Sequence, residues 1–105
     1  MQKNADVERR QVRAGSAMMV LELTVNNHPG VMSHICGLFS RRAYNLEGIV
    51  CVPIANGEIS RMWLQINEEQ KLDQVIKQVQ KLPDVLGIVR HDAGHEIFTG
   101  LSAFV

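Results

Sequence analysis

The chain has 105 residues, 46% of them hydrophobic, and its eleven lysines and arginines balance eleven aspartates and glutamates. This length suits one compact domain with a core of its own, and a formal net charge of zero produces no field that would attract nucleic acid or an anionic membrane. No apolar run is long enough to span a bilayer and the first residues carry charges throughout, so we expect a cytoplasmic protein without a signal peptide.

The first third of the chain predicts an arm, a strand and a helix. Residues 1–17 are polar and offer little to bury, which is typical of a flexible arm. Apolar residues alternate from Met18 to Val25, which predicts a strand with one well-buried face. Pro29 suits the first position of a helix, and a wide apolar stripe from Val31 to Ala43 predicts a helix of about 15 residues. Within it, we expect Gly37 to permit close packing on the sheet.

The middle of the chain predicts a β-hairpin. Leu46–Ile54 and Ile59–Ile66 have the composition of strands, and the Asn56-Gly57 pair between them is a strong turn signal. Pro53 cannot donate a hydrogen bond to a neighbouring strand. We therefore place the strand that contains it at the edge of the sheet.

A second helix and a last strand follow. Asn67 is a candidate helix cap with Gln70 three residues later, and apolar residues recur at helical spacing from Leu72 to Leu82. Val85–His91 predicts the fourth strand. The apolar tail, residues 93–105, predicts either an additional short strand or a segment that docks on a partner.

The order β-α-β-β-α-β predicts an α+β domain over residues 18–92. Right-handed crossovers turn this order into the ferredoxin-like fold, a four-stranded antiparallel sheet with both helices on one face. Because this fold serves unrelated functions, it does not identify one.

Several kinds of site are disfavoured by the sequence. The third strand, ISRMWLQI, has one aromatic residue and lacks the basic and aromatic pattern of an RNA-binding domain, and the first loop lacks the CxxC of a copper chaperone. His34 and Cys36 point to different sides of a helix, and Cys36 and Cys51 are expected to be buried free thiols. We predict no catalytic set and no metal site. The remaining histidines are interpreted as surface residues: His28, His91 and His95.

Trp63 is the single tryptophan, and strand alternation places it on the sheet face that the helices leave open. With Arg61 on the same face, it is a candidate contact with a partner protein. The alternative is that Trp63 is partly buried against the N-terminal arm or the C-terminal tail.

The loop Asn26–Gly30 joins a strand to a helix N-terminus, where backbone N–H groups lack partners and the helix dipole is positive. Such a place suits a carboxylate. The carbonyl oxygen of Asn27 can accept a hydrogen bond from an ammonium group, and Gly30 keeps side-chain bulk out of a ligand's approach. These groups match a free α-amino acid, although the same residues also serve simply to build the turn.

A resemblance bears on these alternatives. The run ELTVNNHPGVMSHICGLFSRRAYNLEGI, the SRMWLQ strand and the pattern through LPDVLGIVRH resemble the ACT domain, a family of small-molecule sensors in amino-acid metabolism. More narrowly, the sequence is similar to the small regulatory subunits of acetohydroxyacid synthase (acetolactate synthase), and among these to the short isozyme I type. The likeness covers residues 18–91.

The resemblance implies a non-catalytic regulatory subunit, a homodimer that binds and activates a large catalytic subunit and confers feedback inhibition by L-valine. It implies that this partner carries thiamine diphosphate, magnesium and FAD, and that this chain binds none of them. The implied effector site combines a loop of one protomer with a segment of the other: Asn27, His28, Pro29, Gly30, Val31 and Met32, facing Asn45, Leu46, Glu47, Gly48 and Ile49. A second hypothesis is a stand-alone amino-acid sensor that regulates another enzyme or transcription.

Overall fold

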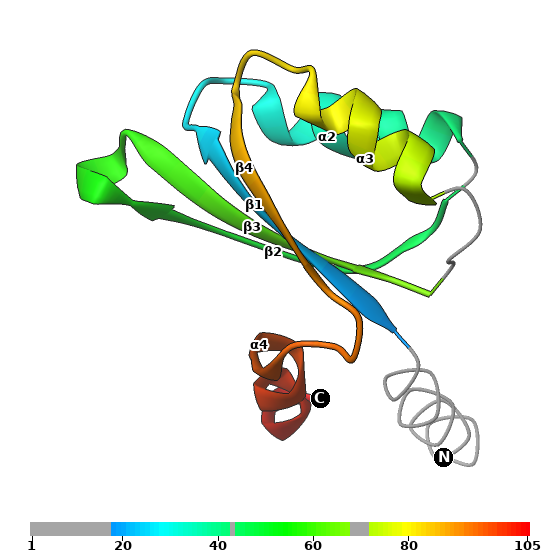
Figure 1. Ribbon diagram of the computed structural model, residues 1–105. Coiled ribbons are helices and arrows are strands. Elements are labelled where there is room, and N and C mark those ends of the chain that lie inside the picture. The colour runs from blue at the N-terminus through cyan, green and yellow to red at the C-terminus, as the bar shows by residue number, and fades with distance from the viewer. Residues whose placement is uncertain (1–17, 43, 68–71) are drawn as a thin grey trace.

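The computed structural model describes residues 18–42, 44–67 and 72–105, so the predicted arm and the Gln70 half of the predicted helix cap lie outside the described residues. The strands and helices follow the predicted order, with one more helix in the tail (Figure 1). They are β1 (Met19–Asn26), α2 (Val31–Arg41), β2 (Leu46–Ile54), β3 (Ile59–Ile66), α3 (Leu72–Gln80), β4 (Val85–His91) and α4 (Glu96–Leu101).

The four strands form one antiparallel sheet in the order β2-β3-β1-β4. Figure 1 shows α2 and α3 together on one face of this sheet, while α4 lies on the opposite face. The predicted ferredoxin-like fold is therefore confirmed, and β2 and β4 are its two edge strands.

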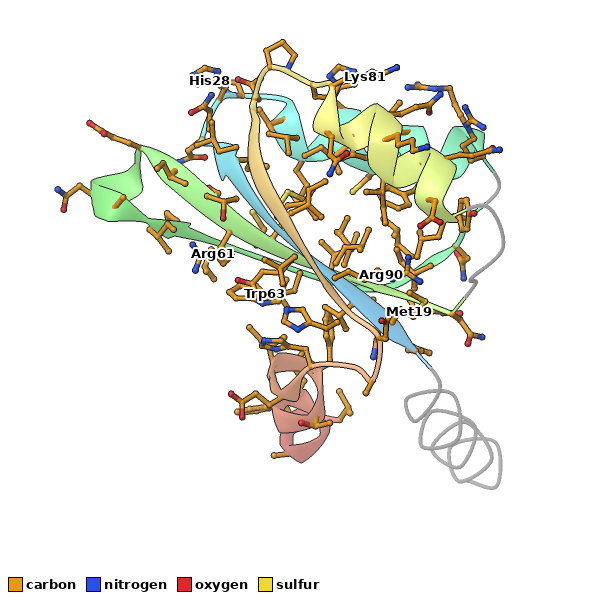
Figure 2. The ribbon with its side chains drawn as sticks, in the orientation of Figure 1. Met19, His28, Arg61, Trp63, Lys81 and Arg90 are labelled. Atoms are coloured by element: carbon orange, nitrogen blue, oxygen red, sulfur yellow. The ribbon has the colours of Figure 1, made fainter. Side chains whose placement is uncertain are left out.

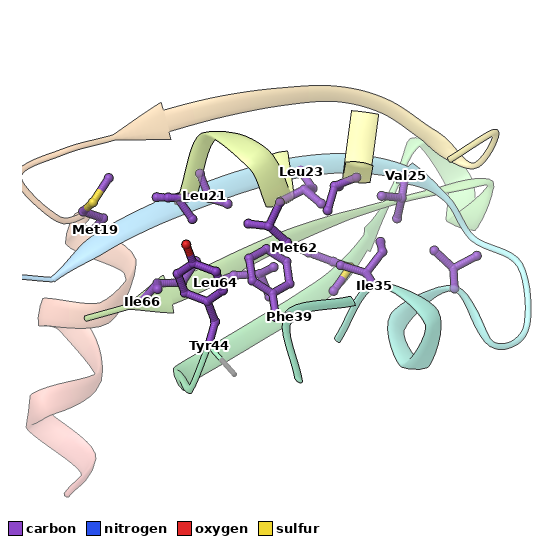
Figure 3. Close-up of a cluster of buried hydrophobic side chains, with 14 residues drawn as sticks. Met19, Leu21, Leu23, Val25, Ile35, Phe39, Tyr44, Met62, Leu64 and Ile66 are labelled. Atoms are coloured by element: carbon purple, nitrogen blue, oxygen red, sulfur yellow. The ribbon is translucent and has the colours of Figure 1, made fainter. Parts of the chain in front are cut away.

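The core lies between the sheet and the two long helices (Figure 3). In β1 and β3 every second side chain points into it, and the register pairs Leu21 with Leu64 and Leu23 with Met62. From α2, Ile35 and Phe39 are fully buried against this face. The alternation that the sequence predicted for β1 and β3 is thus the alternation that divides the core face from the open face.

The β2–β3 connection lies where the Asn56-Gly57 pair predicted it. The connection is longer than a two-residue turn, because a 3₁₀ turn covers Ala55–Gly57 and the Glu58 N–H donates to the Ala55 carbonyl at 3.2 Å. Asn56 and Gly57 have φ angles of 60° and 86°, a conformation that asparagine and glycine adopt at low cost. The prediction that Pro53 marks an edge strand is also confirmed.

The expectation for Gly37 is wrong. A methyl group built at this position would meet only the Arg41 guanidinium, at 3.5 Å, and no part of the sheet. At Gly37 no atom of the sheet comes close enough to the backbone of α2 to require a glycine.

The tail forms a helix and not the additional strand that was one of its two predicted states. The 3₁₀ turn Ser102–Phe104 follows α4 directly. The sequence of α4, EIFTGL, is too short to show a helical period. We therefore attribute the helix to packing of the tail against the sheet. None of the helices within residues 18–42, 44–67 and 72–105 has the length and apolar character needed to cross a membrane.

Candidate effector-binding site

The loop between β1 and α2 is held on both sides by neighbouring loops. The Asn26 N–H donates to the Asp84 carbonyl at 2.8 Å, and the Asn27 N–H donates to the Glu58 carbonyl at 3.0 Å. One bond reaches the connection before β4 and the other reaches the β2–β3 connection. These bonds fix the path of the chain into α2.

Two predicted site residues of this loop have defined side-chain partners. The Asn27 side-chain N–H donates to the Gly57 carbonyl at 2.8 Å, which leaves the side-chain carbonyl oxygen of Asn27 as an available acceptor. His28 Nδ1 lies 2.9 Å from an Asp84 carboxylate oxygen, and Figure 2 shows His28 at the outer end of the loop. His28 therefore holds the loop in place, and its imidazole is directed to Asp84.

The N-terminus of α2 has no side-chain cap. Gly30 is the N-cap residue with φ 83° and ψ −6°, no side chain caps the helix, and no acidic residue occupies the first turn. The Val31 N–H donates to the His28 carbonyl at 3.3 Å. Backbone N–H groups of a first helical turn have no partner within the helix, and the helix dipole adds positive potential there. An uncapped terminus of this kind is suited to an anionic group such as a carboxylate.

A pocket of about 260 Å³ lies at this terminus. Its volume is below the range of roughly 300–1,000 Å³ that drug-sized ligands occupy, which suits a smaller molecule. Five of the six predicted loop residues line it, and Pro29 is the exception. Its full lining is Val25, Asn26, Asn27, His28, Gly30, Val31, Met32, Ser33, Cys51, Ser60 and Met62.

Five of the residues that line the pocket were missed because they come from the helix itself and from the strands: Val25, Ser33, Cys51, Ser60 and Met62. Among the residues that the structure describes, Ser60 is the polar residue that is buried, with 5% exposure. The signal was in the sequence, since Ser60 occupies a core-facing position in a strand whose other core-facing residues are apolar.

The two cysteines differ from expectation. Cys36 is only partly buried and Cys51 is exposed, although both were expected to be buried. Burial raises the pKa of the Cys36 thiol, and the neighbouring Cys51 raises it further. A raised pKa disfavours the reactive thiolate of Cys36 at neutral pH.

The second group of predicted site residues, Asn45–Ile49, does not line this pocket. It begins after α2 ends, where Tyr44 packs edge-on against Phe39 with ring centroids 6.3 Å apart. Figure 1 shows this start of β2 and the β1–α2 loop at opposite ends of α2. A single chain therefore does not bring the two groups together.

Within that second group, β2 is irregular. Leu46 pairs with Ile66 and Gly48 pairs with Gln65, so Glu47 is an additional residue in the register. Such a bulge redirects side chains and is frequent beside functional sites. Glu47 and Ile49 are exposed, and Asn45 precedes them as an exposed residue.

Trp63 lies on the open face, as predicted, and is half-buried there (Figure 2). The His95 ring lies over it, with centroids 6.1 Å apart, so the tail covers part of this side chain. Arg61 lies on the same face beside Glu22, at 3.6 Å. Of the two interpretations of Trp63, burial against the tail is observed, while its contact with a partner protein stays a prediction.

The interpretation of His91 and His95 as isolated surface residues is wrong. Both imidazoles are partly buried and point to Glu22, from positions that are 69 and 73 residues away in sequence. Only the pairing of β4 with β1 and the docking of the tail bring them together. No spacing rule detects such a group.

Comparison with known proteins places this geometry in a family. The model of the AHAS small subunit-like ACT domain matches residues 21–87. The acetolactate synthase isozyme 1 small subunit of Escherichia coli K12 is 49% identical over 86 residues, which are 82% of this chain and 90% of that protein. The isozyme 3 small subunit of the same organism is 39% identical over 70 residues, 66% of this chain but 43% of that longer protein.

Solved structures agree on the fold. The acetolactate synthase small subunit of Thermotoga maritima superposes with a TM-score of 0.62 at 23% identity, covering 83% of this chain and 67% of that one. The ACT domain of the Chlorobium tepidum GTP pyrophosphokinase gives 0.57 at 21% identity, covering 70% of this chain and 95% of that one. At such identities the likeness shows the fold alone.

Proposed function

This chain belongs to the family of AHAS small subunit-like ACT domains, and from this premise we propose that it is the regulatory subunit of an acetolactate synthase. In this proposal it binds the large catalytic subunit, raises its activity, and confers feedback inhibition by L-valine. The chain itself is non-catalytic. The observation that carries the proposal is the uncapped N-terminus of α2, which opens into a pocket lined by the β1–α2 loop.

Each part of free L-valine has a matching group. The carboxylate is placed at the start of α2, because no side chain caps the helix there and the Val31 N–H has only a long bond of 3.3 Å to the His28 carbonyl. The ammonium group is placed at the side-chain carbonyl of Asn27, whose amide nitrogen is already bonded to Gly57. The isopropyl group then contacts Val31 and Met32, which line the same pocket.

Completion of the site requires a second copy of the chain. We propose that edge strand β2 pairs with β2 of another protomer, which brings Asn45–Ile49 of that protomer to the open side of the pocket. Large apolar side chains near this edge support the proposal, since Met32 and Ile49 are 46% and 44% exposed in the single chain. A second copy would cover them and give the isopropyl group an enclosed apolar site.

In this proposal, valine bound between two protomers changes the activity of the catalytic subunit by favouring one arrangement of the dimer. A ligand shifts an equilibrium only by its difference in affinity for the two states. An inhibited arrangement that binds valine about 100-fold more tightly gains about 2.7 kcal/mol of coupling, a usual magnitude for allosteric proteins. The thiamine diphosphate, magnesium and FAD of the reaction are assigned to the catalytic subunit, and none to this chain.

The test is reconstitution with a synthase large subunit. A tagged chain should capture the large subunit from a purified mixture, raise its acetolactate-forming rate, and make that rate sensitive to L-valine. A matched reaction with D-valine controls for nonspecific amino-acid effects. Absence of capture and of activation would refute the regulatory-subunit proposal. Valine binding without any effect on the synthase would instead support a stand-alone sensor that regulates another target.

A further inference from the structure

The C-terminal helix α4 is attached to the open face of the sheet at two places. The Phe98 ring packs directly on Gly48 of β2, where an added Cβ would lie 2.7 Å from the ring. His95, just before α4, lies over Trp63 of β3. The tail makes both contacts with strands that are distant from it in sequence. A cluster of polar side chains on the same face includes His95.

This polar group contains one carboxylate and two imidazoles from β1, β4 and the tail. Glu22 Oε1 lies 3.0 Å from His91 Nε2 and 3.9 Å from His95 Nε2, and the two imidazole rings are 4.7 Å apart. Ligand atoms of all three residues lie within 4.8 Å of one another. Each side chain is partly buried, with exposures of 20%, 28% and 23% for Glu22, His91 and His95.

We propose that Glu22, His91 and His95 form a binding site for a divalent transition-metal ion of the Zn²⁺ or Ni²⁺ class, which fastens the tail to the sheet. Two imidazoles and one carboxylate are a donor set that such ions prefer, whereas Mg²⁺ and Ca²⁺ prefer oxygen ligands. The site is independent of the valine pocket, since none of the three residues lines that pocket.

The spacing is close to what a metal ion requires. With metal–ligand bonds of about 2.0–2.2 Å, neighbouring ligands of a tetrahedral ion are roughly 3.4 Å apart. The distances of 3.0 and 3.9 Å from Glu22 bracket this value, so small side-chain rotations suffice. Arg61 Nε lies 3.6 Å from the other oxygen of Glu22, beyond hydrogen-bond distance, so Oε1 of Glu22 is the oxygen directed to the imidazoles.

Metal binding requires a change in the tautomer of His95. His95 Nδ1 accepts a hydrogen bond from the Ile97 N–H at 3.0 Å, so the neutral ring carries its proton on Nε2, beside Glu22. A metal ion on His95 Nε2 moves this proton to Nδ1 and breaks the bond to Ile97. Three metal–ligand bonds are formed in exchange for this one hydrogen bond and the His91–Glu22 contact.

The single tryptophan provides a direct measurement, because Trp63 lies beside His95. We would titrate the full chain, in a Cys36→Ser/Cys51→Ser background that removes thiol ligands, with Ni²⁺ and follow tryptophan fluorescence, which Ni²⁺ quenches at short range. We expect saturable quenching with one ion per chain, reversed by EDTA and absent with Mg²⁺.

Three variants locate the ion. Glu22→Gln and His95→Gln should each weaken Ni²⁺ binding at least about tenfold, the lower end of the effect of ligand-shell changes. His34→Gln, which alters an exposed histidine on α2, should leave binding unchanged. Circular dichroism verifies folding, and His95→Gln, in the tail, provides the test if Glu22→Gln fails to fold. Absence of saturable quenching, or unchanged binding in His95→Gln, would overturn the proposal.

Discussion

At the scale of single residues, Gly30 determines what the N-terminus of α2 can receive. Its φ of 83° lies in the left-handed region, and a Cβ at this position would meet nothing within 4 Å. A side chain here has room beside the pocket that Gly30 lines, but the left-handed backbone strains residues other than glycine and, to a lesser degree, asparagine and aspartate. The charge of a side chain introduced at this position therefore changes the electrostatic potential at the N-terminus of α2.

We predict that Gly30→Asp abolishes the response to L-valine, because it puts a negative charge at the N-cap of α2 that repels the carboxylate of the ligand. Gly30→Asn is the matched control, since asparagine has the same size and tolerates left-handed backbone but carries no charge. Calorimetric titration with L-valine should show no binding for Gly30→Asp and weakened binding for Gly30→Asn. Full sensitivity of Gly30→Asp would refute the assignment of the loop.

The sequence predicted the loop that lines the pocket because the signals of this loop are local. Proline, glycine and two asparagines mark the turn between a strand and a helix without any tertiary information, whereas the missing side-chain cap is known only from the structure. Ser60 and Cys51 were missed because their roles depend on which strands pair, and the register that places them beside the loop is set by long-range packing.

At the scale of elements, α4 and β2 depend on each other through Phe98 and Gly48. A Cβ at Gly48 would lie 2.7 Å from the Phe98 ring and 2.9 Å from the Gln65 side chain. Gly48 therefore allows the tail to lie on the sheet. Gly48 also belongs to the segment proposed to face the valine pocket of another protomer, so in that proposal the tail would lie next to the effector site.

We predict that Gly48→Ala lowers the free energy of unfolding by about 1–3 kcal/mol and releases the tail, the usual cost of overpacking. Gly87→Ala is the control, because Gly87 is also a strand glycine but a Cβ there would meet nothing within 4 Å. Urea unfolding gives the stability, and amide exchange of α4 reports the docking of the tail. Equal stability of the two variants, with α4 equally protected, would contradict the contact.

A second prediction for an element concerns α2. Gly37→Ala should raise the free energy of unfolding by up to about 1 kcal/mol, because alanine favours the helix and its methyl group has room in the chain. Urea unfolding of the variant and the parent measures the difference. A destabilised variant would contradict the open surroundings of Gly37.

At the scale of the whole molecule, the two groups of predicted effector residues lie at opposite ends of α2 (Figure 1). They form one site only if two chains pair through their β2 edges, so that each site takes one group of residues from each chain. The fold was predictable because the strands and long helices have strong local periodicity. The tail and the Glu22–His91–His95 group were not, because both depend on packing between distant segments.

Exchange between protomers predicts complementation. Asn45→Ala alone should weaken valine binding, although Asn45 does not line the pocket of its own chain. In a mixed dimer of a Gly30→Asp chain and an Asn45→Ala chain, one site combines both changes and the other is unaltered. Dimers purified through two different tags should regain one valine site with parental affinity. Failure to regain it would place each site within a single chain.

We propose that this chain recognises the carboxylate of a free amino acid at the start of α2, and calorimetry can test this recognition. We would titrate the full chain with L-valine and with L-valinamide, which has the same side chain and ammonium group but no carboxylate. Charged hydrogen bonds contribute about 1.5–3 kcal/mol, so the amide should bind at least about tenfold more weakly. Equal affinity for the two ligands, or no binding of L-valine, would contradict the account.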